Sequence, residues 1–450
     1  MSATKTTATA TVTTPPHHSA LPYLGDALAV FRNPLTYAQR HFQRFGPVWA
    51  TTFRGKPTVV AVSAAAQRQI FDTNSANFLW HPGYGAMGDE LFGDALFLLD
   101  GERHRFQRTM MTPAFHGKHY AGYLAAMNAA IDKQLATWGA SGETDLYPQL
   151  RTIAFSLATN LLAGTDFGSS QPRMQALFTT MIAGATSLSH ARLSWTRYGQ
   201  ALNARKQIEP VLTDLIQQRR DTPTNDALGL LVQARDEDGK QLSDDELIAQ
   251  AITMVFAGHD STSSTITWLL LELLRHPGLL DRVRSLVGSG DAPLTLETLK
   301  DPFLDALVKE SLRLHPAAVV LMRGAVNDFT LLGSPNEDQE YRIAGGAQVL
   351  MLPVFVHHRP DYWENPETFD PDRFLPPRDE DARTPYAFVG FGAGKRSCIG
   401  SGIAQMEVKA LLVKILRRFD LTLTPGQDTR PIYLPLSRPR TPVHITYTSR

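Results

Sequence analysis

The sequence predicts a mainly α-helical protein with a few small β-sheets. Helix-forming residues dominate the middle of the chain, roughly from residue 117 to 220, and return with capping residues from 243 to 276. Short segments with strand composition lie in the first and last thirds of the sequence. No repeat, Gly/Ser linker or charge block divides the 450 residues, so we expect one large domain.

The N-terminal segment begins with a polar stretch. Its first twenty residues are rich in Thr and Ala and lack an apolar core segment, which predicts a disordered tail over 1–20 and a folded domain over 21–450. We expect short helices and loops from Tyr23 to about Arg54. Residues 58–63 predict a strand because most of them are β-branched.

The longest helix is predicted over 243–276. Ser243 and Glu246 have the spacing of a capping box, and Pro277 marks the end of the helix. The same signals predict four later segments: a helix over 301–315, strand-like pieces over 348–356, a polar proline-rich stretch over 357–383, and a helix over 402–419.

Composition excludes several classes of protein. Lys and Arg together number 44 and Asp and Glu together also number 44, so no excess charge indicates nucleic acid or an anionic membrane as a partner. No apolar run approaches the roughly 18 residues that a membrane-spanning helix needs. The single cysteine is typical of a reducing cytosol. We therefore expect a soluble cytoplasmic protein.

The only cysteine, Cys398, lies in the sequence Phe-Gly-Ala-Gly-Lys-Arg-Ser-Cys-Ile-Gly over 391–400. One cysteine forms no intrachain disulfide, and zinc and iron–sulfur sites need several ligands. It can supply the single axial thiolate of a haem. Nearby glycines, Arg396 and the helix that follows favour this interpretation over a buried structural thiol.

The long helix carries small and hydroxyl-bearing residues. Asp260 beside Ser261 and Thr262 supplies the acid and hydroxyls of a proton relay. A glycine inside a helix, such as Gly258, lowers the stability of the helix by about 1 kcal/mol relative to Ala. Either a large flat group approaches the backbone there, or the helix packs closely against another. Residues at three- and four-residue spacing are expected to share this face: Met254, Ala257, Gly258, Ser261, Thr262 and Thr265.

Glu310 and Arg313 place a carboxylate and a guanidinium one helical turn apart. Such pairs are common on helix surfaces and contribute only about 0.2–0.5 kcal/mol. Arg373, within Phe-Asp-Pro-Asp-Arg-Phe over 369–374, could close a planar Glu–Arg–Arg network that fixes one segment against another.

Together these motifs give a family resemblance. In their order and separations, the cysteine loop, the 369–374 segment and the two helices resemble a cytochrome P-450, a haem-thiolate monooxygenase of the soluble bacterial type. The resemblance spans about the last two hundred residues, and weaker matches extend it nearly to the N-terminus. It implies a single-domain cytochrome P-450 fold with haem between the long distal helix and the helix after the cysteine loop.

The resemblance also implies roles for individual residues. Cys398 would ligate the iron of haem b, and Ser261 stands where the family most often has threonine. Residues implied in binding the cofactor are Cys398, Phe391, Arg396, Arg323, His104, Arg108, Ala257, Gly258 and Gly400. Residues implied in proton delivery are Asp260, Ser261 and Thr262, and those implied in a structural network are Glu310, Arg313 and Arg373. For His104 and Arg108, a solvated basic helix face is the alternative.

The implied partners are a hydrophobic small molecule, dioxygen and a separate ferredoxin or flavodoxin with its reductase. The protein itself is expected to be a monomer. The sequence has no Gly-x-Gly-x-x-Gly motif in a strand–turn–helix setting and no further region for a flavin domain. Several basic residues could form a docking face for the redox partner, or could simply be solvated. They are Arg103, Arg105, Arg108, Lys118, Lys395 and Lys409. Apolar side chains expected around the substrate include Phe78, Trp80, Tyr84, Phe92, Phe97, the segment 181–193, Met254 and the segment 319–322.

Two other functions stay open at this point. One is a haem-thiolate enzyme that uses or isomerises a peroxide without an electron supply, which would not need the relay at Asp260 and Ser261. The other is a haem-binding sensor without catalysis, whose haem spectrum would not respond to lipophilic compounds.

Overall fold

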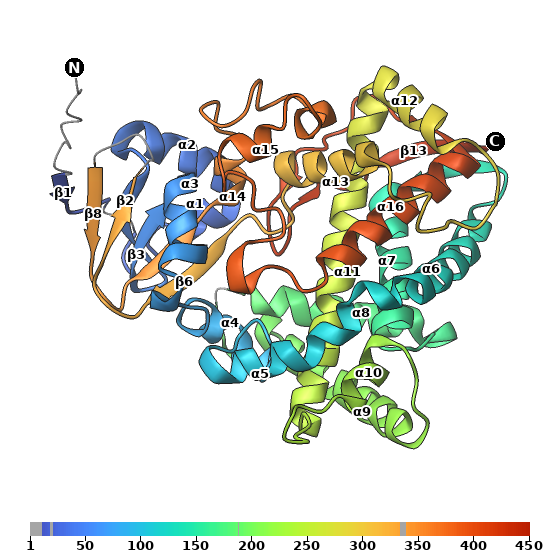
Figure 1. Ribbon diagram of the computed structural model, residues 1–450, viewed down its shortest axis with the longest axis horizontal. Helices are drawn as coiled ribbons and strands as arrows, with labels where there is room; N and C mark the ends of the chain where they lie inside the picture. The colour runs from blue at the N-terminus through green and yellow to red at the C-terminus, as the bar shows by residue number, and fades with distance from the viewer. Residues whose placement is uncertain (1–10, 19–20, 188, 334–338) are drawn as a thin grey trace, which may run out of the picture. The chain divides into compact units, whose positions relative to one another are not determined.

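The computed structural model describes residues 11–18, 21–187, 189–333 and 339–450. The chain forms two compact units, and each combines segments distant in the sequence (Figure 1). The first unit consists of residues 1–84 and 318–398, and the second of residues 85–317 and 399–450.

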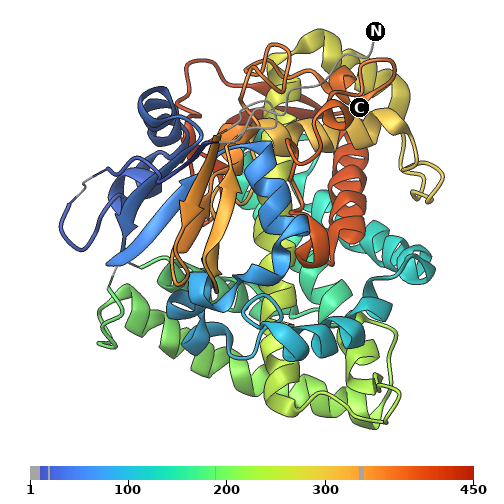
Figure 2. The same cartoon turned by 60° about the vertical axis from the view of Figure 1, so that its left-hand side comes forward.

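A five-stranded mixed sheet is the framework of the first unit, with strand order β2-β3-β9-β6-β4. β2 (Val48–Phe53) pairs antiparallel with β3 (Lys56–Ala61), and β3 pairs parallel with β9 (Gln348–Met351). β6 (Leu321–Ala325) pairs antiparallel with β9 and with β4 (Phe78–Leu79). Figure 2 shows the blue and orange strands side by side. The strand predicted over 58–63 is therefore confirmed, two residues earlier than expected.

Strand composition explains why this sheet forms. The last four residues of β3 and all four residues of β9 are buried, because the sheet carries apolar side chains on both faces. Val59, Val349 and Met351 join Ile70, from the turn Gln69–Thr73, in the core of the first unit.

A second sheet in this unit has the order β1-β8-β7, made of β1 (Thr11–Thr13), β8 (Gln339–Ile343) and β7 (Phe329–Leu332). The amide of His18 also donates to the carbonyl oxygen of Ala50 at 2.8 Å. The prediction of a disordered tail is wrong for residues 11–18, because their backbone groups pair with distant strands. Residues 1–10, 19 and 20 of that predicted tail lie outside the described residues.

Short helices surround these sheets. The prediction of strand-like structure up to residue 356 is wrong after Met351, because Pro353 has no amide to donate to a sheet and instead begins α14. The helices and single turns of the first unit are α1 (Ala27–Arg32), α2 (Pro34–Phe45), α3 (Ala64–Arg68), α14 (Pro353–Val356), α15 (Glu380–Arg383) and the turns Gln69–Thr73, Ser75–Asn77, Pro371–Phe374 and Gly394–Arg396.

The second unit is built around the long helix α11 (Asp244–Arg275), drawn in yellow in Figure 1. Its prediction is confirmed: the Ser243 and Glu246 side chains form the capping box, and Pro277 begins the next helix. α11 packs against α7 (Leu146–Leu162) and α16 (Ser401–Arg418).

α4 (His81–Phe92) has its first residues in the first unit and the others in the second. The remaining helices of the second unit are α5 (Gly101–Met111), α6 (Tyr120–Leu135), α8 (Gln171–Ala185), α9 (Arg197–Asp221), α10 (Ala227–Gln233), α12 (Pro277–Val287) and α13 (Pro302–Leu314). Single turns lie at Thr112–Phe115, Gly117–His119, Ala136–Trp138 and Gly168–Ser170. The helices predicted over 301–315 and 402–419 are confirmed within one residue at each end.

Small antiparallel sheets complete this unit. β13 (His444–Ser449) lies between β10 (Phe419–Leu423) and β5 (Ser141–Asp145), and β11 (Pro431–Ile432) pairs with β12 (Arg438–Pro439). Across the described part of the chain, none of the helices combines the length and apolar character needed to cross a bilayer.

Candidate active site

The cysteine loop is a series of tight turns in the first unit. The amide of Gly392 donates to the carbonyl oxygen of Val389 at 2.9 Å, and the amide of Cys398 donates to that of Phe391 at 2.8 Å. The second bond closes the loop and fixes the backbone of Cys398, which is exposed. α16 begins at Ser401, three residues after Cys398 in the sequence.

Gly394 is required in this loop for two reasons. Its φ of +64° lies in the left-handed region that favours glycine. A Cβ atom there would also lie 2.0 Å from the carbonyl oxygen of Phe71, a backbone atom that cannot move away cheaply. Residues 69–73 therefore support the cysteine loop directly.

Two cationic side chains in the first unit meet one indole ring. The guanidinium carbon of Arg323, on β6, lies 3.8 Å from the ring centroid of Trp80, and that of Arg396 lies 5.8 Å from it. Arg323 is 2% exposed and also donates to the carbonyl oxygen of Met322 at 2.7 Å. The structure thus places two arginines that the resemblance implied in binding the cofactor around the ring of Trp80, which the sequence assigned to the substrate.

His104 and Arg108 lie one turn apart on α5 in the second unit, with His104 buried and Arg108 half-buried. The exposed cations of this helix are Arg103 and Arg105, which pair with Asp94 at 2.5 Å and with Glu102 respectively. The alternative of a solvated basic face therefore applies to Arg103 and Arg105, but not to His104.

Fewer of the six small residues of α11 are accessible than the sequence indicates. Ala257 and Ser261 are accessible, and we call their side of the helix its open face. Ala257 is exposed and Ser261, one turn later, is half-buried. The Ser261 hydroxyl donates to the carbonyl oxygen of Ala257 at 2.5 Å, a local bond that often bends a helix. Met254, Thr262 and Thr265 are buried, so the six small residues do not form one accessible stripe.

Asp260 is buried and paired. Arg151, on α7, donates from Nε and places Nη2 within 2.9 Å of Asp260 Oδ1. His259 Nε2 lies 3.4 Å from the same oxygen, and the charged form of this buried histidine is disfavoured by desolvation, which lowers its pKa. The acid of the predicted relay is thus attached to a neighbouring helix by an ion pair that the sequence did not indicate.

The hydroxyl of Thr262 has a different hydrogen-bond partner from that of Ser261. Its hydroxyl donates to Glu407 Oε2 on α16 at 2.9 Å, and Glu407 Oε1 has no hydrogen-bond partner. Burial raises the pKa of Glu407 to about 8, although the bond from Thr262 lowers it in part. This buried acid was missed in the sequence because one glutamate in an amphipathic helix has no distinguishing pattern.

Gly258 has a packing explanation. A Cβ atom at this position would lie 2.9 Å from Leu162 Cδ1 and 3.4 Å from Ala158 Cβ, both on α7. Of the two explanations that the sequence left open for this glycine, the structure supports close packing of helices. Its predicted contact with the cofactor stays a prediction. Gly400 has a φ of −89° and a Cβ there would meet only ordinary contacts, so neither requires glycine.

Glu310 and Arg313 form a bidentate ion pair in the second unit. Arg313 Nε lies 2.7 Å from Glu310 Oε2 and Arg313 Nη2 lies 2.9 Å from Oε1, and both side chains are fully buried. The alternative of a surface pair is therefore wrong. Such a pair is costly to break because the remaining charge would be left buried.

Arg373, in the first unit, is also fully buried. Its Nη1 donates to Glu380 Oε2 and to the carbonyl oxygen of Glu364, each at 2.8 Å. Burial alone would raise the pKa of Glu380, but hydrogen bonds from Arg378, from the Glu364 amide and from Arg373 lower it. The sequence did not identify Glu380 as a partner, and the complete Glu–Arg–Arg network stays a prediction.

The predicted basic docking face needs one correction. Lys409 is 9% exposed, and its Nζ donates to the carbonyl oxygen of Leu299 at 2.7 Å and to Asp305 at 2.6 Å. It therefore joins α16 to α13 and is not available to a partner. Lys118 and Lys395 are exposed.

Several apolar residues that the sequence expected around the substrate pack against other aromatic side chains or are buried, and their contact with substrate stays a prediction. Phe92 is 3% exposed, and its ring centroid lies 5.2 Å from those of Phe97 and Phe256. Met181 is fully buried. Trp80 and Tyr84 stack with centroids 5.1 Å apart, and burial raises the pKa of Tyr84.

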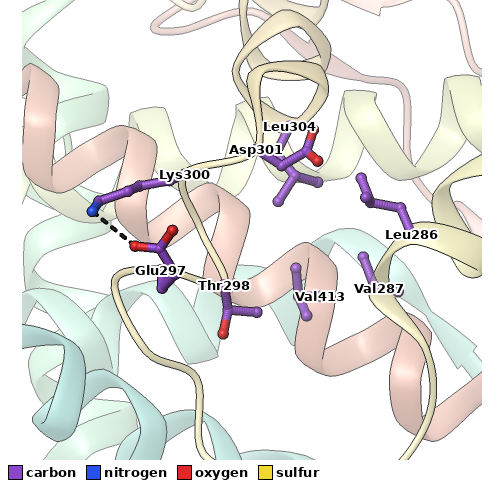
Figure 3. A pocket seen from close by; sticks show the side chains of 8 residues that line it. All are labelled: Leu286, Val287, Glu297, Thr298, Lys300, Asp301, Leu304 and Val413. Atoms are coloured by element: carbon purple, nitrogen blue, oxygen red, sulfur yellow. Dashed lines mark hydrogen bonds and ion pairs between the residues drawn. The ribbon is translucent and has the colours of Figure 1, made fainter.

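A surface pocket of about 330 Å³ lies in the second unit, and none of the predicted site residues is among those that line it (Figure 3). Its Glu297 and Lys300 side chains pair with each other at 2.8 Å. Its lining is formed by Leu286, Val287, Glu297, Thr298, Lys300, Asp301, Leu304 and Val413. These exposed, mutually neutralised charges do not resemble an enclosed apolar substrate site.

Comparison with known proteins identifies the family. A family model described as cytochrome P450 matches residues 15–447. The chain belongs to the cytochrome P450 family. Cytochrome P450 120 of Synechocystis sp. is 33% identical to it over 95% of each chain. The sterol 14α-demethylase of Mycolicibacterium vanbaalenii is 28% identical over 87% of each chain.

The fold of this P450 is also that of a solved structure. Cyanobacterial CYP120A1 with bound retinoic acid superposes with a TM-score of 0.89 and 32% identity, over 98% of this chain and all of the other. The predicted family, fold, haem-thiolate monooxygenase activity and haem b cofactor are therefore confirmed.

The side chains of this P450 suit that cofactor. Haem of this family has a cysteine thiolate ligand, and Cys398 is the only cysteine of the sequence, so Cys398 is the residue that would supply it. The exposed thiol on a closed loop and the neighbouring arginines Arg323 and Arg396 supply one soft ligand and two cations for carboxylates. When bound, haem supplies the activation of dioxygen and the insertion of one oxygen atom into substrate. The contacts predicted for Phe391, His104, Arg108, Ala257 and Gly400 stay predictions.

Proposed function

We propose that this monooxygenase acts on an elongated apolar molecule of the isoprenoid class. The observation that carries the proposal is the similarity over nearly the whole chain to CYP120A1, whose structure contains retinoic acid. The sterol 14α-demethylase relative acts on a second isoprenoid-derived molecule. Both ligand classes fall within the hydrophobic small molecules expected from the sequence, an expectation that also covers fatty acids and polyketides.

Within this function, Ser261 and Asp260 have separate roles. The Ser261 hydroxyl, on the open face of α11, holds a proton for the oxygen that leaves as water. Asp260, released when its ion pair with Arg151 opens, would take protons from solvent water and pass them to Ser261. The local bond from Ser261 to Ala257 supports this arrangement, because it fixes the hydroxyl on the open face.

The electrons come from a small ferredoxin or flavodoxin and its reductase. Exposed Lys395, in the cysteine loop, would attract an acidic partner, so electron transfer would slow as ionic strength rises. A peroxide-dependent reaction is the competing function. It would proceed with hydrogen peroxide alone and would be independent of the reduced protein.

Spectral titration tests the substrate class. The purified holoenzyme is mixed with retinoic acid, lanosterol or, as a matched apolar control, palmitic acid, and the haem spin state is followed by absorbance. We expect a spin-state shift with retinoic acid or lanosterol and product formation once ferredoxin, its reductase and reduced nicotinamide are added. A response to palmitic acid alone would contradict the isoprenoid assignment.

A further inference from the structure

Three potential metal ligands meet in the first unit, in a part of the chain that the monooxygenase reaction does not use. They are His18, Asp26 and His41, and one ligand atom from each lies within 4.8 Å of the others. His18 Nε2 is 3.4 Å from Asp26 Oδ1, and the two imidazole rings have centroids 4.7 Å apart in an edge-to-face arrangement. The three residues come from three separate segments.

The carboxylate of Asp26 is oriented for this cluster. Asp26 precedes α1 at the N-cap position, where an aspartate usually accepts a hydrogen bond from the helix, but its side chain makes no such bond here. Its Oδ2 instead accepts from the hydroxyls of Tyr37 and Thr51, each at 2.7 Å. Oδ1 therefore remains directed toward His18. Asp26 is 5% exposed, so this orientation is fixed by buried neighbours.

His41 is held in the tautomer that a metal requires. Its Nδ1 donates to the carbonyl oxygen of Tyr37 at 2.9 Å, which leaves the lone pair on Nε2. The ring stacks on Trp49 with an interplanar angle of 22°. A backbone carbonyl bound to the far nitrogen is the usual support for a metal-binding histidine.

We propose that His18, Asp26 and His41 form a binding site for a divalent transition metal ion, with Zn²⁺ as the ion that best suits the ligands. Two imidazole nitrogens and one carboxylate oxygen are a common zinc donor set, and water would complete a tetrahedral site. His18 and His41 are only half-buried, so an ion can enter from solvent. Small side-chain rotations would bring the donors to coordination distance.

The ion would join three segments of the first unit. His18 follows the stretch that pairs with β2, since the Ala50 amide donates to the Pro16 carbonyl oxygen at 2.9 Å. Asp26 precedes α1, and His41 lies on α2. Bound Zn²⁺ would therefore hold residues 16–18 against these helices and raise the unfolding temperature of the protein.

Calorimetric titration of the tag-free, chelator-treated holoenzyme with Zn²⁺ tests the proposal. We expect one zinc ion per chain. His41→Phe retains the stacked ring without its nitrogens and should weaken binding by at least about 100-fold, beyond the effect of losing an outer-shell partner. His18→Gln should weaken it similarly. His17→Ala, at the exposed neighbouring histidine, is the matched control and should bind as the wild type does.

X-ray absorption at the zinc edge identifies the donors. We expect only nitrogen and oxygen neighbours at about 2.0–2.1 Å, whereas a scatterer at about 2.3 Å would show sulfur from Cys398 and contradict the site. The proposal is also overturned if the wild type binds no zinc at micromolar concentration, which would leave His18 and Asp26 as a simple ion pair. Equal binding by the folded His41→Phe variant would overturn it as well.

Discussion

At the scale of single residues, the adjacent hydroxyls of Ser261 and Thr262 on α11 have different surroundings. Ser261 lies on the half-open face, whereas Thr262 is buried and donates to Glu407. The sequence placed both residues in proton delivery, because adjacency in a helix says nothing about which neighbouring helix each side chain meets. The structure leaves Ser261 as the better placed of the two.

Replacing each hydroxyl separates these roles. Ser261→Ala should divert a large part of the electrons from product to hydrogen peroxide, since the hydroxyl nearest the open face is lost. Thr262→Val should leave that ratio nearly unchanged but lower the unfolding free energy by about 1–3 kcal/mol, because Glu407 loses its hydrogen bond. The measurement is the ratio of peroxide to product per reduced nicotinamide consumed. Higher peroxide from Thr262→Val alone would reverse the assignment.

Glu407 makes stability depend on pH. Its pKa is about 8 in the folded protein, against 4.5 for a glutamate exposed to water, so between these values the unfolded carboxylate has lost its proton while the folded one keeps it. Stability therefore falls as pH rises through this window, by up to about 1.4 kcal/mol per pH unit. In Glu407→Gln this decline should be absent.

Urea unfolding of wild type and Glu407→Gln at several values between pH 5 and 8 checks this prediction. The advantage of the glutamine variant should grow with pH. Glu297→Gln, which changes an exposed glutamate, is the control and should show no such trend. A constant difference between Glu407→Gln and wild type would mean that Glu407 is ionised throughout.

At the scale of elements, the cysteine loop depends on a turn built by residues far away in sequence. Gly394 approaches the backbone of Phe71, and Cys398 bonds back to Phe391. Gly394→Ala should displace the loop, because the new methyl group meets a carbonyl oxygen and the φ is positive. We expect loss of most haem or a shifted absorption band of the reduced carbon-monoxide complex.

The matched control for this variant is Gly122→Ala, near the start of α6, where nothing lies within 4 Å of the added atom. It should retain haem and the wild-type spectrum. A normal spectrum from Gly394→Ala would show that the loop tolerates displacement at this turn.

Local signals predicted the elements whose ends are marked in the sequence. The capping box and Pro277 define α11 to within a residue, because caps are properties of neighbouring residues. β1 was missed because it pairs with β8, more than three hundred residues later, and three residues alone have no strand signal. Arg151 as the partner of Asp260 was missed for the same reason, since the two lie on different helices.

At the scale of the whole molecule, the cofactor links stability to ligand binding. Haem binds the folded chain, so its removal should lower the unfolding temperature by several degrees or more. Unfolding curves of holoenzyme and haem-free protein check this prediction. Iron-free protoporphyrin should restore only part of the difference, because it keeps carboxylates for the arginines but cannot bind Cys398. Full restoration would show that the thiolate bond adds no stability.

The family, cofactor and fold were predictable because they depend on a few spaced motifs around Cys398 and Glu310. The division into two compact units was not, because residues 318–398 return to the first unit after more than two hundred residues in the second. Contacts between distant segments, such as that of Gly394 with the backbone of Phe71, leave no local pattern in the sequence.

The single cysteine has a practical consequence for spectroscopy. With the sulfur of Cys398 as the proposed iron ligand of the holoenzyme, a cysteine introduced at an exposed position would be the only thiol open to a maleimide dye or spin label. One such position in each unit, without any background cysteine to remove, would provide a molecular ruler. Ligand-induced motion could then be followed in solution in an otherwise unmodified enzyme.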